Sequence, residues 1–243
     1  MNRSLILYKY RSFGEYADKI ILNSELYFAS HTSFNDPFDC NLEFEEDGDF
    51  NKHCETLNKT EKSLLGEKTI EDYKKDLKRN LIIEKSKVGI LSMSTNNKNI
   101  LMWSHYADNH KGLCFGFKND FYKESGITMS KVIYSEDDRY ELIPYLGCEI
   151  EDIKRMFTLK SRYWEYEEEF RLLDLKNSYG LKRFNNKYLK EILFGCKADE
   201  TNIKKIIQLC QLNGFKHVIF KKARIVPGKF ELDFDELDKN KYL

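Results

Sequence analysis

Short apolar runs alternate with polar segments along the chain, and this pattern predicts many short strands with a few helices between them. Runs rich in β-branched and aromatic residues and bounded by turn residues are typical of strands. Apolar residues at three- and four-residue spacing are typical of helices. Strands are therefore expected at 4–10, 25–30, 88–94, 112–117, 131–136, 167–175, 190–195 and 217–226. Helices are expected at 14–24, 99–110, near 141–160 and at 199–215 with a stop at Gly214.

This order of elements predicts an α+β fold. It shows no regular strand-helix-strand alternation and no glycine-rich phosphate loop, so a doubly wound parallel sheet is disfavoured. We expect a mixed, mainly antiparallel sheet of short strands with helices packed around it. Residues 1–243 are expected to form a single domain, with a charged helical insertion at about 45–87.

Composition narrows the class of protein. Aromatic residues make up 14% of the 243 residues and proline only 3 positions, which favours a folded chain with a bulky core. Lys plus Arg and Asp plus Glu are 40 each, so no overall charge draws the protein to nucleic acid or membrane, although a local basic groove stays open. Six scattered cysteines without a CxxC pair indicate reduced thiols. With no apolar run of membrane length, we expect a cytoplasmic protein.

The stretch LMWSHYADNHKGLCFGF (101–117) concentrates aromatic and protonatable side chains before an apolar strand. His105 and His110 are five residues apart, which is not the four-residue spacing that places two metal ligands on one helix face. A metal site would need a further ligand, such as Cys40 or Asp39. Two other interpretations remain open: core packing with hydrogen-bonded histidines, or the wall of a cleft that holds a flat ligand.

The stretch WEYEEEFRLL (164–173) is the second candidate. On a strand, Glu165, Glu167, Glu169 and Arg171 would point to one face, because side chains alternate. A solvated sheet face gives the same pattern. However, like charges two residues apart repel, and a carboxylate row suits a site that grips ribose hydroxyls and stabilises an oxocarbenium-like centre.

The stretch SFNDPFDC (33–40) is the third candidate, and its plainest interpretation is a capped turn. Asp36 before Pro37 favours a rigid turn at the end of a strand. Asn35 and Asp39 would then project polar groups from that end.

Together, FNDPFD, the block MWSHYADNHKGLCFGF and the strand WEYEEEFR resemble the bacterial family called domain of unknown function 2971. The segments LYKYRS, LYFAS, ILSMS, VIYSE and EILFG follow the order of that family. The resemblance covers most of the chain outside 45–87.

The opening LYKY strand, the ILNSELYFAS unit and the late acidic strand before EILFG more distantly resemble ADP-ribosyltransferases of the DarT-like branch. That resemblance implies NAD as substrate, held by a polar residue of the first strand and by aromatic or hydroxyl residues of middle strands. It also implies a catalytic glutamate on a late strand. The chain departs from the pattern with Lys9 where histidine is common, and with SMST at 92–95 in place of a Ser-Thr-Ser triplet.

Carried over position by position, Glu169, Glu167, His105 and Tyr106 are expected to be catalytic. The residues expected to bind NAD are Lys9, Tyr10, Asn35, Asp36, Ser94, Trp103, His110 and Arg171. The expected function is an NAD-dependent ADP-ribosyltransferase-like enzyme that acts on nucleic acid or protein as a toxin or anti-phage effector. The alternatives are a non-catalytic nucleotide- or partner-binding module of a defence system, or a metal-dependent hydrolase or nuclease.

Overall fold

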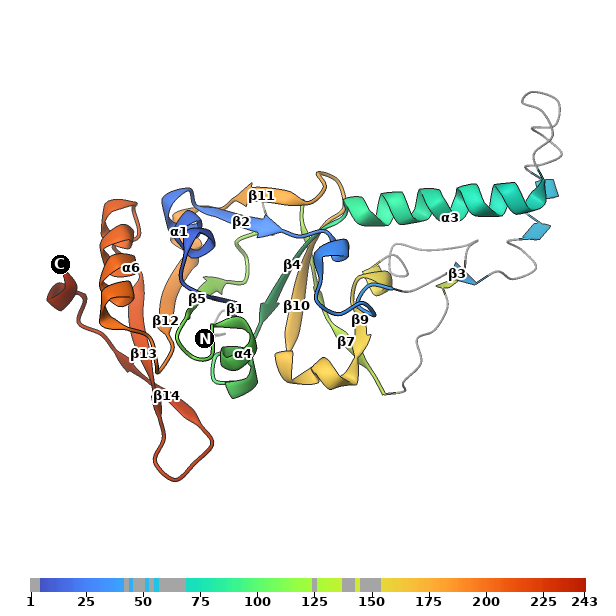
Figure 1. Cartoon of the computed structure of the whole chain (residues 1–243). Coiled ribbons are helices and arrows are strands. Elements are labelled where there is room, and N and C mark those ends of the chain that lie inside the picture. Colours follow the sequence, from blue (N-terminus) through green and yellow to red (C-terminus); the bar gives the residue numbers. More distant parts are fainter. Residues whose placement is uncertain are drawn as a thin grey trace.

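The computed structural model of the protein (Figure 1) describes residues 5–41, 44–45, 51–52, 55–56, 69–123, 126–136, 143–144 and 154–243. The central sheet is built from β1 (Ile6–Arg11), β4 (Gly89–Ser94), β5 (Leu113–Lys118), β6 (Thr128–Lys131), β10 (Glu169–Asp174), β12 (Leu189–Phe194), β13 (Ile219–Ile225) and β14 (Leu232–Glu236). These strands lie in the order β14-β13-β12-β5-β1-β4-β10-β6. Within this sheet only β12 and β13 run parallel. The expected α+β class with a mainly antiparallel sheet is confirmed, while likeness to ADP-ribosyltransferases stays a prediction.

Within the described part of the chain, three smaller strand pairs and four α-helices accompany the sheet. The pairs are β2 (Glu25–Phe28) with β11 (Gly180–Arg183), β3 (Phe44–Glu45) with β8 (Ile143–Pro144), and β7 (Ile133–Ser135) with β9 (Leu159–Ser161). The helices are α1 (Glu15–Leu22), α3 (Ile70–Lys87), α4 (Ile100–Tyr106) and α6 (Glu200–Leu212). None of the helices in the described ranges is long and apolar enough to cross a bilayer.

Side-chain alternation along β1 builds a core on each face of the sheet. Leu7 belongs to the larger core, in which α1 and α6 bury Ile21 and Ile207. Tyr10 belongs to a second core on the other face, where α4 buries Trp103. Each face of the sheet is thus covered by helices in the middle of the molecule, and β1 lies between the two cores.

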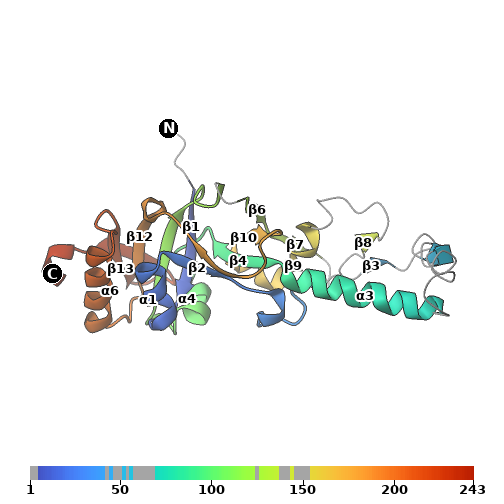
Figure 2. The same cartoon turned by 90° about the horizontal axis from the view of Figure 1, so that it is seen from above.

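Helix α3 extends beyond the end of the sheet, as both views show (Figure 1, Figure 2). Its start is fixed by a capping box, in which the Thr69 side chain accepts from the Asp72 N–H and the Asp72 carboxylate accepts from the Thr69 N–H. Helix α3 occupies the last part of 45–87, the range expected to be a helical insertion, and most of 46–68 lies outside the described residues.

The expected element positions agree with the structure for most strands of the sheet. Helix α6 also ends as expected, since Gly214 has φ +85 directly after the cap Asn213. Of the helix expected near 141–160, the described residues are helical at 154–156, whereas Ile143–Pro144 forms β8 and Leu159–Ser161 forms β9, which pairs with β7. The strand expected at 131–136 is divided between β6 and β7. Strands β11 and β14 were not expected from the pattern; β11 pairs with the distant β2, whereas β14 forms a hairpin with the preceding β13.

Candidate functional site

A cavity of about 560 Å³ lies where the central sheet opens between β1 and β4. These strands pair at a single position, Tyr8 opposite Ser94, whereas β1 pairs with β5 along its whole length. Residues of both strands line the cavity, together with the segment that follows β2, helix α4 and the stretch 160–169. The opening of the sheet therefore exposes side chains of a central strand to a ligand-sized space.

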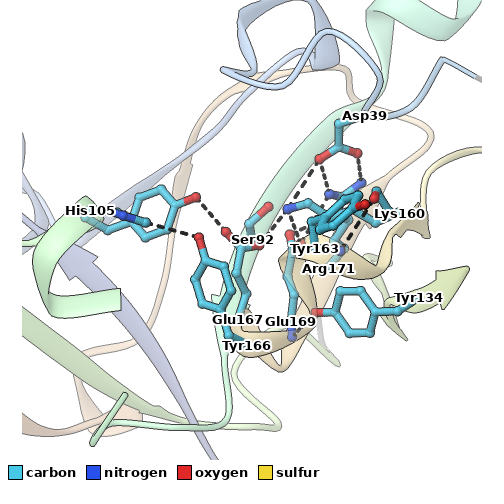
Figure 3. Close-up of polar contacts among 12 residues, drawn as sticks. Asp39, Ser92, His105, Tyr134, Lys160, Tyr163, Tyr166, Glu167, Glu169 and Arg171 are labelled. Atoms are coloured by element: carbon cyan, nitrogen blue, oxygen red, sulfur yellow. Dashed lines mark hydrogen bonds and ion pairs between the residues drawn. The ribbon is translucent and has the colours of Figure 1, made fainter. Parts of the chain in front are cut away.

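Glu169 lies at the start of β10 and is held by two cations (Figure 3). Arg171 donates from Nε to Glu169 Oε1 at 2.9 Å and from Nη2 to Oε2 at 3.2 Å. Lys160 Nζ lies 3.1 Å from the same Oε2. Burial opposes ionisation of this carboxyl, but the charges of Arg171 and Lys160 outweigh it and lower its pKa to about 2. Glu169 is a permanent anion at neutral pH.

Arg171 is fully buried and joins β10 to the turn after β2. Its Nη1 donates to Asp39 Oδ1 at 2.8 Å and its Nη2 to Oδ2 at 2.6 Å, which is the bidentate geometry that guanidinium and carboxylate favour. The same Nη1 donates to the Phe157 carbonyl at 2.8 Å. Although burial disfavours the charge, Glu169 and Asp39 raise the pKa of Arg171. The turn FNDPFD is thus anchored beneath the cavity by an ion pair.

Glu167 is a second buried carboxylate in the cavity wall, with a different environment. It accepts from the Tyr106 hydroxyl at 2.5 Å and from Lys160 Nζ at 2.5 Å. Burial and the neighbouring Glu169 raise its pKa, and the charge of Lys160 offsets them only in part. The two carboxylates share one ammonium group, yet their pKa values move in opposite directions.

Glu167 lies outside strand β10. The expected row of carboxylates on one face of that strand is therefore wrong. Residues Arg162–Glu167 form a 3₁₀ helix, and Glu168 has a left-handed φ of 45 before β10 begins. Glu165 is exposed, so only Glu169 and Arg171 share the strand face. The carboxylates nevertheless meet, because the turn at Glu168 brings Glu167 back beside the start of the strand.

The first strand contributes Lys9 and Tyr10 to the cavity. Lys9 Nζ spans the opening and donates to the Ser92 carbonyl on β4 at 2.8 Å. Burial and the nearby charge of Arg11 lower the pKa of Lys9 to about 7. The Tyr10 hydroxyl donates to the Asn96 carbonyl at 2.7 Å. A cation and an aromatic residue of one strand thus line the cavity, and of the two Lys9 is the one on which the charges of Glu167 and Glu169 act.

The structure brings most of the expected site residues to this cavity. Those that line it are Lys9, Tyr10, Asn35, Ser94, His105, Tyr106, Glu167 and Glu169. His105 contacts the Tyr166 hydroxyl through Nδ1 at 3.1 Å, on the α4 side of the site. Arg171 lies just behind the wall, in contact with Glu169.

Three of the residues expected to bind NAD, which are Trp103, His110 and Asp36, do not line this cavity. Trp103 is 0% exposed and donates from Nε1 to the Asn97 carbonyl, so its ring packs in the core against Tyr10. His110 lies in the turn before β5, and burial lowers its pKa. Asp36 caps its own turn by accepting from the Phe38 N–H at 2.9 Å. Trp103 and Asp36 thus use their polar groups in local structural roles, whereas His110 Nδ1 is buried without a hydrogen-bond partner among the described residues.

Lys160 and Arg11 are the charged residues of the cavity lining that the sequence did not suggest. Lys160 falls in the segment expected to be helical, and it reaches the cluster only because β9 places it there. It lies within ion-pair distance of Asp39, Glu167 and Glu169. These carboxylates raise the pKa of Lys160, although burial opposes them. Among the described residues, no group of three His, Cys, Asp or Glu side chains is arranged to hold a metal ion.

One known protein family matches part of the chain that forms this site. Comparisons with curated proteins and with solved structures gave no match. Residues 102–172 match the model of a family described as protein of unknown function, DUF2971. That segment runs from α4 to the middle of β10 and contains Tyr106, Lys160, Glu167 and Glu169. The match supports the resemblance to this family over the segment that supplies much of the cavity wall.

Proposed function

We propose that the protein is an ADP-ribosyltransferase-like enzyme that transfers the ADP-ribose group of NAD to an acceptor. The observation that carries this proposal is a pair of buried carboxylates at one cavity with opposite pKa shifts, Glu169 lowered and Glu167 raised. When the environments of two carboxyl groups move their pKa values in opposite directions, the ionised group can stabilise positive charge and the other can transfer a proton. Reactions that transfer a glycosyl group require both roles.

Glu169 would stabilise positive charge on the ribose while the bond from its anomeric carbon to nicotinamide breaks. The bonding electron pair leaves with the nicotinamide nitrogen, which loses its positive charge. Arg171 and Lys160 hold the Glu169 carboxylate ionised and fixed, so its orientation needs no change during the reaction. The acceptor atom then forms the new bond to the anomeric carbon.

Glu167 would take the proton that the acceptor loses. A base works best when its pKa lies near the working pH, and burial moves the pKa of Glu167 in that direction. Tyr106 and Lys160 donate hydrogen bonds to its two carboxylate oxygens and so orient it. Tyr10 and His105 place further rings on the cavity lining, and the volume of about 560 Å³ is within the range of nucleotide-sized sites.

The test is NAD turnover and transfer of labelled ADP-ribose to nucleic acid or protein. We expect wild-type protein to consume NAD, Glu169→Gln to lose activity, and Glu167→Gln to lose transfer along with the acidic limb of the pH profile. Glu165→Gln is the matched control, because Glu165 is exposed in the same segment. Growth arrest on expression of wild-type protein, absent with Glu169→Gln, would support a toxin or anti-phage role. A folded protein that neither binds nor turns over NAD with any acceptor class would refute the proposal.

A second candidate is a nucleotide-binding module without catalysis. The observation that favours it is that Lys160 and Arg171 already neutralise Glu169 and Asp39 within the wall. This candidate predicts that NAD or a related nucleotide binds without turnover. It also predicts that Glu167→Gln leaves the dissociation constant unchanged.

A further inference from the structure

We propose that Lys9 and Arg11 form an anion-binding site at the opening between β1 and β4, and that this site binds a phosphate group together with a proton. The inference deepens the proposed function and rests on it for a nucleotide as the ligand. It assigns the phosphate end of that ligand to the first strand, while the carboxylates act at the other side of the cavity.

The two side chains leave β1 on the same face and both line the cavity. Their Cα atoms are about 7 Å apart, since they are two residues apart on a strand. The ammonium of Lys9 has three donors, and its hydrogen bond goes to the Ser92 carbonyl. Arg11 Nε is buried without a hydrogen-bond partner. Both residues therefore line the cavity and carry N–H donors beyond the single hydrogen bond described for Lys9.

Among the described residues, the acidic groups around the cavity form their ion pairs with cations other than Lys9 and Arg11. Lys160 and Arg171 engage the acidic side chains of the wall, which are Asp39, Glu167 and Glu169. Within the described ranges, no carboxylate forms an ion pair with Lys9 or Arg11. Partly buried cations without a partner are costly, and an entering anion would remove that cost. A phosphate fits best, because a guanidinium and an ammonium are the usual pair of groups that bind it.

Proton uptake on binding is expected because of the protonation state of the Lys9 side chain in the free protein. The groups that act on its ammonium are Arg11 on the same strand, Glu169 on β10, Glu167 on the 3₁₀ helix and Cys114 on β5. With a pKa of about 7, Lys9 is largely neutral at pH 8 in the free protein. A bound anion favours the charged form, so binding at pH 8 would draw a proton from solution.

The test is calorimetric titration with ADP-ribose at pH 8 in two buffers of different ionisation enthalpy. The diphosphate of ADP-ribose keeps its charge across this pH range, so any proton taken up belongs to the protein. We expect wild-type protein to take up about half to one proton per ligand, and its affinity to fall up to tenfold per pH unit above 7. Inorganic pyrophosphate, used for affinity alone, tests the anion site without a nucleoside.

Substitutions test whether Lys9 and Arg11 are the residues that bind the anion. Lys9→Met should weaken ADP-ribose binding at least tenfold and abolish proton uptake, while Arg11→Gln should weaken it similarly and keep proton uptake. Lys205→Met is the control, because Lys205 is exposed on α6 and pairs with Asp18. Should Lys9→Met fail to fold, the wild-type proton count and Arg11→Gln still decide the question.

The outcomes separate this inference from the proposed reaction. Binding that depends on Lys9 and Arg11, without NAD turnover, supports the anion site and refutes the reaction. Turnover that is unaffected by either substitution refutes the anion site and leaves the reaction standing. Failure of wild-type protein to bind both ADP-ribose and pyrophosphate also overturns the anion site.

Discussion

Replacing Asp39 by asparagine tests whether the buried ion pair beneath the cavity stabilises the fold. The Asp39 side chain is 4% exposed and receives both Nη groups of Arg171, whose side chain is 0% exposed. Asparagine keeps the size of the side chain but turns one acceptor into a donor that faces the guanidinium. Removing one partner of a buried pair costs about 3–5 kcal/mol, and we expect the lower end because Glu169 remains bound to Arg171.

Asp36→Asn is the matched control from the same turn. Asp36 accepts from the Phe38 N–H with one oxygen, and asparagine makes the same bond, so its cost should stay below about 0.5 kcal/mol. Urea unfolding followed by circular dichroism measures both variants. At a slope of about 3 kcal/mol per molar, Asp39→Asn should lower the midpoint by about 1 M. Equal midpoints for the two variants would show that the ion pair adds no net stability.

Two further predictions concern the acidic cluster and the core. The pKa of Glu169 is about 2 against 4.5 for an exposed glutamate, so its ionisation contributes about 3 kcal/mol above pH 4.5 that is lost as pH falls toward 2. Urea unfolding between pH 3 and 7 should therefore depend less on pH in Glu169→Gln than in wild-type protein, and equal slopes would contradict the assignment. Trp103→Phe should lower the free energy of unfolding by about 1–3 kcal/mol without changing the dissociation constant for NAD, because Trp103 is a core residue. A tenfold weaker dissociation constant with unchanged stability would instead return Trp103 to the binding site.

Local patterns were sufficient to predict much of the sheet and part of the site. The apolar run at 88–94 became β4, and the residues before Gly112 became a short helix, because both signals are contained within a few residues. The expectation that Glu169, Lys9 and Tyr106 face one space also agrees with the geometry. Each of these residues belongs to a dense polar motif on a different element.

The other features of the fold and of the site depend on contacts between segments that are distant in sequence. A short stretch of sequence carries no signal for such contacts. Lys160 was placed in a helix, since the partner that makes β9 a strand lies in β7. The left-handed conformation of Glu168 is what separates Glu167 from the strand. Trp103 and His110 appeared suited to ligand binding by residue type alone, but Trp103 is buried in the core and His110 lies in a turn with a left-handed backbone conformation.

The position of β1 has a consequence for synthesis on the ribosome. Both neighbours of this strand, β4 and β5, follow it at Gly89–Ser94 and Leu113–Lys118. At about 5–20 residues per second, roughly 5–20 s pass before β5 can pair with β1. During that time the strand ILYKYR, with its buried Leu7, Tyr8 and Tyr10, has no sheet to join. The charged helix α3 is made within this interval, so the nascent chain would carry its most soluble segment beside an unpaired strand while the remaining strands emerge.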